Sequence, residues 1–231
     1  MLNIVTILAG GFTGLVFGAK IPNRVRQTII YSIGLFTLAL GVSMFLESGN
    51  PLVVLSALLL GGLLGEWLDL EKGLESLGSR LQPKFRGDND EQGGQARFIR
   101  GFLTASLLFE VGPLTILGSI QDGLTGDFRL LATKSVLDGF AAMALASSMG
   151  IGVLFSIVVV FIYQGGISLL AFQVQALMSE TMIAEMTAVG GVLLLGLSVS
   201  SLLEIKKIRT GNLLPALAVA PLISWMIDRF Q

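Results

Sequence analysis

Repeated apolar segments, each long enough to cross a lipid bilayer, restrict this chain to few kinds of fold. A helix needs roughly 20 mostly apolar residues to span the hydrocarbon core of a membrane. Charged residues make up only 13% of the sequence, whereas soluble domains contain roughly 25%. We therefore predict an all-α integral membrane protein with about eight transmembrane segments. These segments lie at 2–18, 28–46, 52–68, 102–120, 130–148, 153–172, 183–203 and 213–227.

The residue types that the sequence lacks exclude several kinds of chemistry. It contains neither cysteine nor histidine, so disulfides, thiol or imidazole catalysis and the usual zinc sites are excluded. A net charge of −1 gives no electrostatic footprint for nucleic acid. No phosphate-binding glycine loop with a lysine is present, and no Tyr-Asp or Gly-x-Gly-Asp motif of an intramembrane aspartyl protease occurs. We expect no enzyme activity, no cofactor and no metal site.

The basic residues predict how the segments are oriented. Of the 15 lysines and arginines, three lie at 20–26, six at 72–100 and three at 206–209. Basic residues concentrate in the loops on the cytoplasmic side of a membrane protein. We therefore place these three stretches inside and both termini outside.

The chain divides into four regions. Leucines at 70, 74, 77 and 81 repeat at helical spacing among charged residues, which predicts an amphipathic helix at the cytoplasmic surface. The stretch that follows is polar and charged, which predicts a flexible loop. The regions are a first three-span unit that ends in the amphipathic helix (1–82), a cytoplasmic loop (83–96), a second three-span unit (97–172) and a terminal helix pair (183–231).

The two three-span units contain a weak internal repeat. At an offset of 105 residues, 33–44 matches 138–149 at five positions, among them Gly34 with Gly139 and Met44 with Met149. The second unit would enter the membrane from the opposite side. Inverted repeats of this kind are typical of secondary transporters, whose sites lie at the repeat interface.

Ionisable residues within the apolar segments are the first candidates for a site, because they are costly in a membrane and are functional by default. Lys134 and Asp138 are four residues apart, so they can pair on one helix face. They either only neutralise each other or form an ion or proton site in which Asp138 is the acceptor. Glu110 and Gln164 are further candidates. Asp122 lies in an acidic glycine turn, which is either an ordinary external turn or a vestibule that attracts cations.

Glycines and prolines mark helix breaks and close packing. Gly112 and Pro113 interrupt the fourth segment, and a break at membrane depth is tolerated only where it faces protein or a cavity. Asn212 and Pro215 begin the last segment, where the asparagine is expected to act as a cap. Small residues let helices approach closely and would also allow a homodimer. The other packing positions are Gly165, Gly166, Gly190 and Gly191.

Several short motifs extend along nearly the whole chain. They are Gly112-Pro113, Gly118-Ser119-Ile120-Gln121-Asp122-Gly123, Lys134-Ser135-Val136-Leu137-Asp138-Gly139, Gln164-Gly165-Gly166, Glu185-Met186-Thr187 and Gly211-Asn212-Leu213-Leu214-Pro215. In this combination the chain resembles the bacterial inner-membrane family of unknown function that includes the YqgA and YdfK proteins. Glu110 departs from the resemblance, which implies a small or thiol residue there. The resemblance implies a multi-pass protein of the bacterial cytoplasmic membrane and brings no substrate.

Two functions fit these features. The first is a transporter or channel for a small solute or ion, with a polar pathway at the repeat interface. Its partners would be the lipid bilayer and that solute. The alternative is a scaffold or sensor that acts through oligomerisation and through its cytoplasmic loop.

Overall fold

A computed structural model describes residues 1–18, 21–73, 76 and 91–230. Its described part is helical and contains no β-strand, as the sequence predicts. The helices are α1 (Leu2–Gly18), α2 (Asn23–Phe45), α3 (Pro51–Trp67), α5 (Glu91–Glu110), α6 (Pro113–Thr125), α7 (Arg129–Met149), α8 (Gly152–Leu169), α9 (Ala171–Leu177), α10 (Glu180–Leu197), the π-helical turn η1 (Ser198–Leu202), the 3₁₀ turn η2 (Thr210–Leu213) and α11 (Ala216–Phe230).

Five described helical stretches are long and apolar enough to cross a membrane. They are α2, α7, α8, α10 extended through η1, and the stretch from η2 to Arg229. The α5–α6 pair gives a sixth if its two helices, bent by 62°, count as one span. Helices α1 and α3 are apolar but have only 17 residues each. The protein therefore has five to six candidate spans, and the predicted count of eight is not confirmed.

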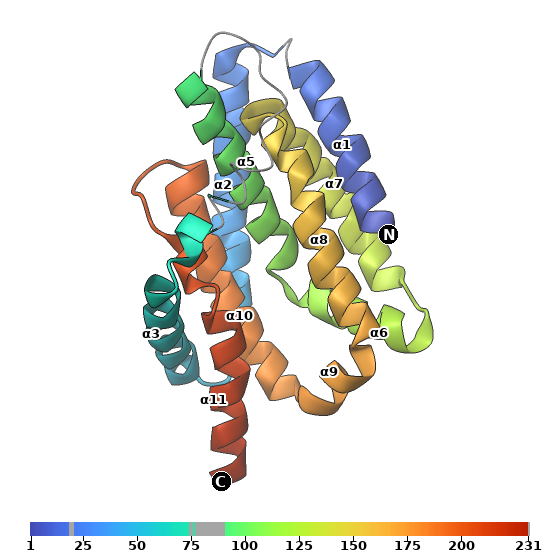
Figure 1. Cartoon of the computed structure of the whole chain (residues 1–231), viewed down its shortest axis with the longest axis vertical. Coiled ribbons are helices and arrows are strands. Elements are labelled where there is room, and N and C mark those ends of the chain that lie inside the picture. The colour runs from blue at the N-terminus through green and yellow to red at the C-terminus, as the bar shows by residue number, and fades with distance from the viewer. Residues whose placement is uncertain (19–20, 74–75, 77–90, 231) are drawn as a thin grey trace.

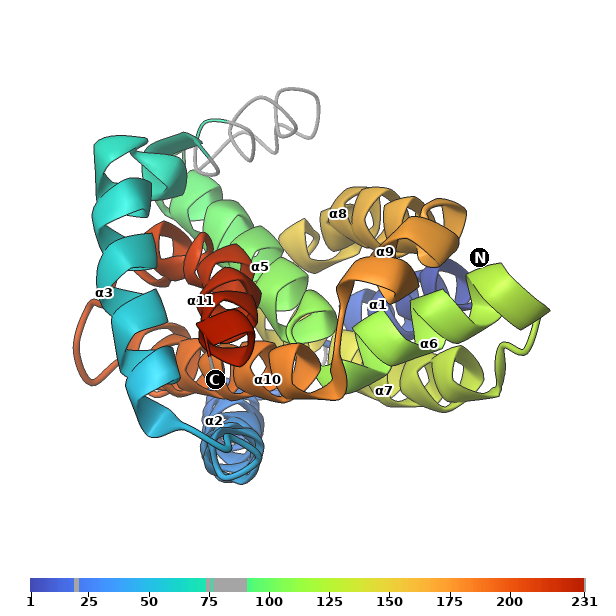
Figure 2. The ribbon, with the colours of Figure 1, turned by 90° about the horizontal axis from the view of Figure 1, so that it is seen from below.

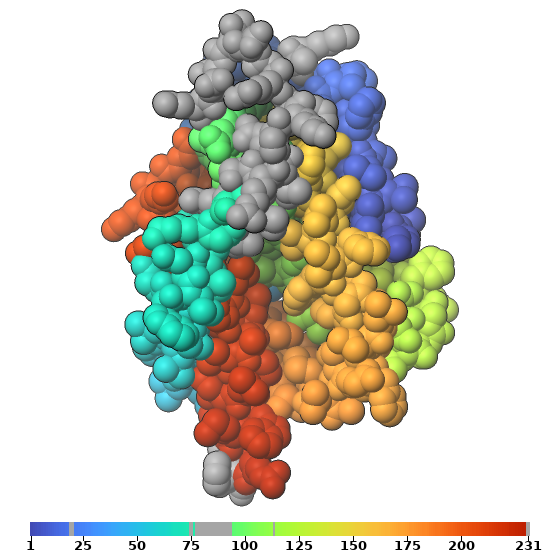
Figure 3. Space-filling model, in the orientation of Figure 1, coloured from blue at the N-terminus to red at the C-terminus, as the bar shows by residue number. Residues whose placement is uncertain are grey.

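Long-range pairs of helices build the bundle. Helix α1 packs along α7, α5 along α8, and α10 lies between α2 and α11. Figure 2 shows α3 beside α11 on the side away from α8, and the space-filling view shows the same division between α3 with α11 and α8 with α9 (Figure 3). We call the end of the bundle where α1 ends, α5 begins and α7 passes into α8 the upper end (Figure 1). The inverted repeat and the positions of the termini remain predictions.

Glycine allows α1 to lie directly against α7. A Cβ atom at Gly10 would come within 2.0 Å of the carbonyl oxygen of Gly139, and one at Gly14 within 2.1 Å of that of Met143. Neither distance is compatible with a side chain. The α2–α10 contact is similar, since a Cβ at Gly191 would meet the Gly41 carbonyl at 2.5 Å. The glycine spacing therefore serves packing within this chain.

The bundle exposes many large apolar side chains and buries several charged ones among its apolar core, which is unusual for a soluble domain. Large apolar side chains such as Phe36 and Leu63 are each 69% exposed, whereas Lys134, Asp138 and Glu110 are buried. Apolar side chains pointing outward match the hydrocarbon of a bilayer, and charged groups in membrane proteins face the bundle interior. Together with the apolar spans, this distribution fits a membrane protein.

Several boundaries differ from those predicted. Helix α5 begins at Glu91, within the stretch predicted to be a loop, although Gly93 and Gly94 disfavour a helix there. Helix α9 (Ala171–Leu177) lies mostly in the connection between the predicted segments 153–172 and 183–203, for which no helix was expected. Of the predicted amphipathic helix at 70–81, residues 70–73 and 76 are helical; its other residues, and 83–90 of the predicted loop, lie outside the described residues.

Candidate functional site

A buried ion pair lies in the middle of α7. Lys134 and Asp138 are one helical turn apart, and Nζ of the lysine contacts Oδ2 of the aspartate. They are only 6% and 8% exposed. The Nδ2 group of Asn3, near the start of α1, donates to the same Oδ2 atom over 2.9 Å. No described residue donates to Oδ1, so this oxygen can still accept a hydrogen bond or bind a cation.

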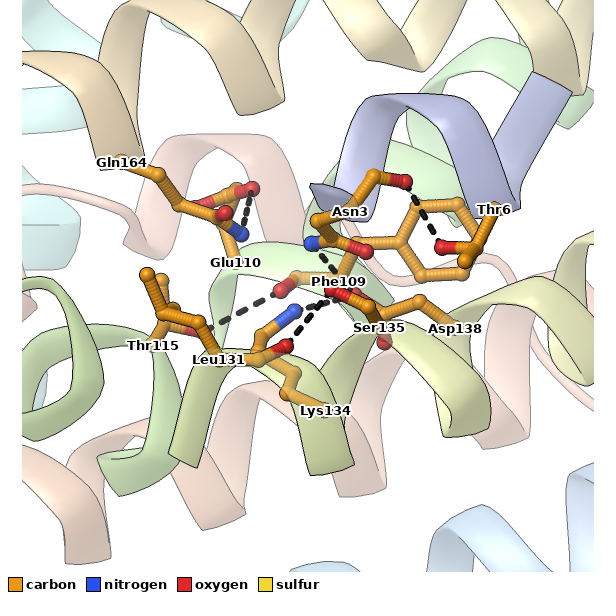
Figure 4. Close-up of polar contacts among 10 residues, drawn as sticks. All are labelled: Asn3, Thr6, Phe109, Glu110, Thr115, Leu131, Lys134, Ser135, Asp138 and Gln164. Atoms are coloured by element: carbon orange, nitrogen blue, oxygen red, sulfur yellow. Dashed lines mark hydrogen bonds and ion pairs between the residues drawn. The ribbon is translucent and has the colours of Figure 1, made fainter. Parts of the chain in front are cut away.

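A second buried carboxyl group faces this pair. Glu110 ends α5, and its Oε1 atom accepts a hydrogen bond of 3.3 Å from Nε2 of Gln164 on α8. Its other oxygen, Oε2, is buried and has no described hydrogen-bond partner. Lys134 and Asp138 both lie within electrostatic reach of this carboxyl group. Figure 4 shows the Glu110–Gln164 pair beside the contacts of Asn3, Lys134 and Asp138.

The helix break places Glu110 in this position. Helix α5 stops at Glu110 and α6 starts at Pro113, where the sequence has the Gly-Pro pair. The buried hydroxyl of Thr115 donates to the carbonyl oxygen of Phe109 over 3.2 Å, so it satisfies a backbone acceptor that the interrupted helix leaves free. The break thus ends a helix inside the bundle at an acidic side chain.

The site is connected to a small cavity. A cavity of about 180 Å³ is lined by Asn3, Asp122 and Gln164, together with the apolar residues Met1, Leu2, Phe128 and Leu131. Asp122 is half-buried there and accepts a hydrogen bond from Ser168 over 3.4 Å. The two amide side chains, Asn3 and Gln164, therefore contact both the cavity and the buried carboxyl groups.

Glu110, Lys134 and Asp138 form a buried cluster whose charges do not balance when all three groups are ionised. Glu110 and Asp138 contribute two negative charges, and Lys134 contributes one positive charge. Of the described residues, no group of three or more acidic side chains is arranged to hold a metal ion. A net buried charge is costly in an apolar interior. Uptake of one proton or one monovalent cation would neutralise this cluster.

The other predicted positions lie elsewhere. A Cβ at Gly190 would meet Val111, next to the break, at 2.8 Å, and Gly191 contacts α2 as described above. In contrast to the expected close packing at Gly165 and Gly166, a Cβ at either position would meet no atom within 4 Å.

The predicted cap at Asn212 was wrong. Asn212 lies in η2, its Oδ1 atom accepts a hydrogen bond from the Glu71 amide over 2.7 Å, and its Nδ2 group donates to Glu66 over 2.6 Å. It therefore connects the end of α3 to η2, while α11 begins only after Pro215, at Ala216.

Sequence reasoning missed Asn3. It is 3% exposed and holds Asp138 from a helix more than 130 residues away in the chain. The available signal was an amide in an otherwise apolar first segment. Glu185 is also buried, and it accepts hydrogen bonds from Ser48 and from the Asn50 amide in the turn between α2 and α3. That contact orders a turn outside the cluster.

Comparison with known proteins places the chain in a family. The family described as "Protein of unknown function (DUF554)" matches residues 1–225. The chain belongs to this family. It is 34% identical, over 234 residues, to the Uncharacterized membrane protein YdfK of Bacillus subtilis (strain 168), with 100% of this chain and 96% of that protein covered. It is 32% identical, over 219 residues, to the Uncharacterized protein YqgA of Escherichia coli (strain K12), covering 95% and 92% of the two chains.

These matches confirm the family resemblance that the motifs indicate. No solved structure matches the chain. The name of YdfK supports a membrane protein, and neither relative's name states a function.

Proposed function

We propose that the protein is a transporter or channel for a small solute or ion, and that transport depends on a proton or monovalent cation taken up by the cluster of Glu110, Lys134 and Asp138. The observation that supports this most is the unbalanced charge of that cluster inside the bundle. An ion pair with a purely structural role would be complete with Lys134 and Asp138. The added carboxyl group, with one buried oxygen unpartnered among the described residues, calls for a ligand or a proton.

The surroundings of the cluster fit a pathway. The cavity of about 180 Å³ lies on one side of it, with Asp122 as an acidic group in its lining. An acidic side chain at a pore mouth attracts cations. Asn3 and Gln164 also line this cavity, and each donates a hydrogen bond to one of the two buried carboxyl groups. Ions entering this way would pass from a half-buried carboxylate to amides and then to the carboxyl pair.

The break between α5 and α6 supplies a place for movement. Discontinuous helices form the binding sites of many secondary transporters. Here the break directly follows Glu110, so a rotation of α6 against α5 would change the surroundings of that carboxyl group. The predicted inverted repeat would place such a site at the interface of the two units.

Ion flux into proteoliposomes tests this proposal. Purified protein is reconstituted, a potassium diffusion potential is imposed, and internal indicators report protons and sodium. We expect the wild-type protein to raise the flux of one of these ions above that of empty liposomes. Glu110→Gln and Asp138→Asn should each lower that flux at least tenfold, because each removes a carboxylate from the pathway.

Glu180→Gln is the matched control. Glu180 is an exposed glutamate at the start of α10, so its change removes the same charge without touching the cluster. The control should retain wild-type flux. Folded and reconstituted Glu110→Gln and Asp138→Asn proteins that conduct as well as the control would contradict the assignment of the site.

A further inference from the structure

A second cavity, at the upper end of the bundle, is lined by two arginines. Its volume is about 350 Å³, and it lies where the ends of α1, α2, α5, α7 and α8 meet. Arg26 of α2 and Arg97 of α5 are its charged lining residues. The remaining described lining is apolar or small, as at Leu15, Phe98 and Ile151, and contains no acidic residue.

These two arginines lack the partners that other arginines of the chain have. Arg100, Arg129 and Arg209 each form an ion pair with an acidic side chain. Within the described residues, these two arginines donate hydrogen bonds only to backbone oxygens. Arg26 donates to the Gly18 carbonyl at 2.7 Å, and Arg97 donates to the Ser148 carbonyl at 2.9 Å. The two are close enough to repel each other.

The hydrogen-bond geometry leaves N–H donors of both arginines free among the described residues. A guanidinium group has five N–H donors, and each of these arginines uses one of its nitrogens to bind a helix-end carbonyl. The Nε atom of Arg26 is buried and has no described partner. Arg97 is more exposed and lies at the opening of the cavity. The amino end of α8 begins beside them at Gly150 and Ile151, and the dipole of a helix favours anions at that end.

We propose that this cavity binds a phosphate group, with Arg26 and Arg97 as its ligands. Paired arginine guanidinium groups match the oxygens of a phosphate, and basic pockets between transmembrane helices bind anionic lipid headgroups. The apolar lining beside the arginines would contact the glycerol and the upper acyl chain of a lipid. A soluble phosphate has the same charged group, and the two sources are separated by experiment.

Native mass spectrometry of the purified full-length protein tests this site. The probes are phosphatidylglycerol, phosphatidylcholine and inorganic phosphate. We expect the wild-type protein to retain phosphatidylglycerol over phosphatidylcholine. Arg26→Gln/Arg97→Gln should bind it roughly tenfold or more weakly, because charge-assisted hydrogen bonds to phosphate are lost. Displacement of the lipid by millimolar inorganic phosphate would identify a soluble phosphate as a ligand of the same site.

Arg24→Gln is the matched control, because Arg24 is exposed and lies only two residues from Arg26 on α2. It should bind the lipid like the wild type. Arg26→Lys/Arg97→Lys keeps both charges and replaces the glutamine variant in the test if that variant does not fold. It should weaken lipid binding by less than the glutamine substitutions do. Equal retention of the two lipids by the wild type, or wild-type binding by the folded glutamine variant, would overturn the proposal.

Discussion

Glu110→Gln and Lys134→Met should change the stability of this protein in opposite directions. Both positions belong to a cluster that carries one net negative charge when ionised. Glu110→Gln brings the charge to zero, keeps the acceptor for Gln164 at the Oε1 position, and adds no volume. Lys134→Met leaves Asp138 and Glu110 together with no described cation, which brings the charge to minus two.

The magnitudes follow from the burial of the groups. Removing one partner of a buried ion pair costs about 3–5 kcal/mol, so we expect Lys134→Met to lower the free energy of unfolding by that amount. Replacing an uncompensated buried charge by a neutral side chain of the same shape removes the desolvation cost of that charge, which stabilises by about 1–3 kcal/mol. We expect Glu110→Gln to fall in this range. The double variant Glu110→Gln/Lys134→Met has the wild-type charge, so it should recover part of the loss.

Equilibrium unfolding in mixed detergent micelles measures these differences. The buffer is alkaline and contains choline as its only added cation, so that neither a proton nor a metal ion occupies the cluster. A double-variant cycle over the two positions should give a coupling energy of about 1–3 kcal/mol. If both single variants lower stability by the same amount and their effects add, Glu110 and Lys134 do not share a charge balance, and our account of the cluster fails.

Further predictions concern packing and the turn between α2 and α3. Gly14→Leu should separate α1 from α7 and lower stability by about 3 kcal/mol or more in the same assay, because its Cβ would overlap the Met143 carbonyl. Gly165→Ala is its control and should be neutral or stabilising by about 0.5–1 kcal/mol, since the space is open; a large loss there would contradict the described packing. Glu185→Ala should cost about 1–3 kcal/mol, because it removes the acceptor of the Ser48 hydroxyl and one of the two acceptors of the Asn50 amide, whereas Glu180→Ala should stay within about 0.5 kcal/mol of wild type.

The sequence predicts the class of fold and part of the site for clear physical reasons. Apolar runs and charge depletion are local properties, so the helical membrane class follows from them. The buried pair of Lys134 and Asp138 follows from a spacing of four residues on one helix. The helix break at Gly112 and Pro113 likewise follows from the backbone properties of these two residues.

Contacts between distant segments could not be predicted in this way. Asn3 reaches Asp138 only because α1 packs along α7. The sequence of either segment, taken by itself, does not show that the two helices pack together. The role of Asn212 was mistaken for the same reason, since a polar residue before a helix is usually a cap. Here its partners are Glu66 at the end of α3 and Glu71 in the helical stretch 70–73 that follows. Glu110 was selected beside a break, but its proximity to Gln164 needed the fold.

Infrared difference spectroscopy on the reconstituted protein tests the central claim most directly, namely that the buried cluster takes up a proton or a monovalent cation. Spectra are recorded between sodium and choline buffers and between two pH values, for the wild type and for Glu110→Gln. We predict a carboxyl signal that changes in at least one of these comparisons and disappears in the variant. The same carboxyl difference spectrum in both proteins would show that Glu110 does not respond, and would contradict the account.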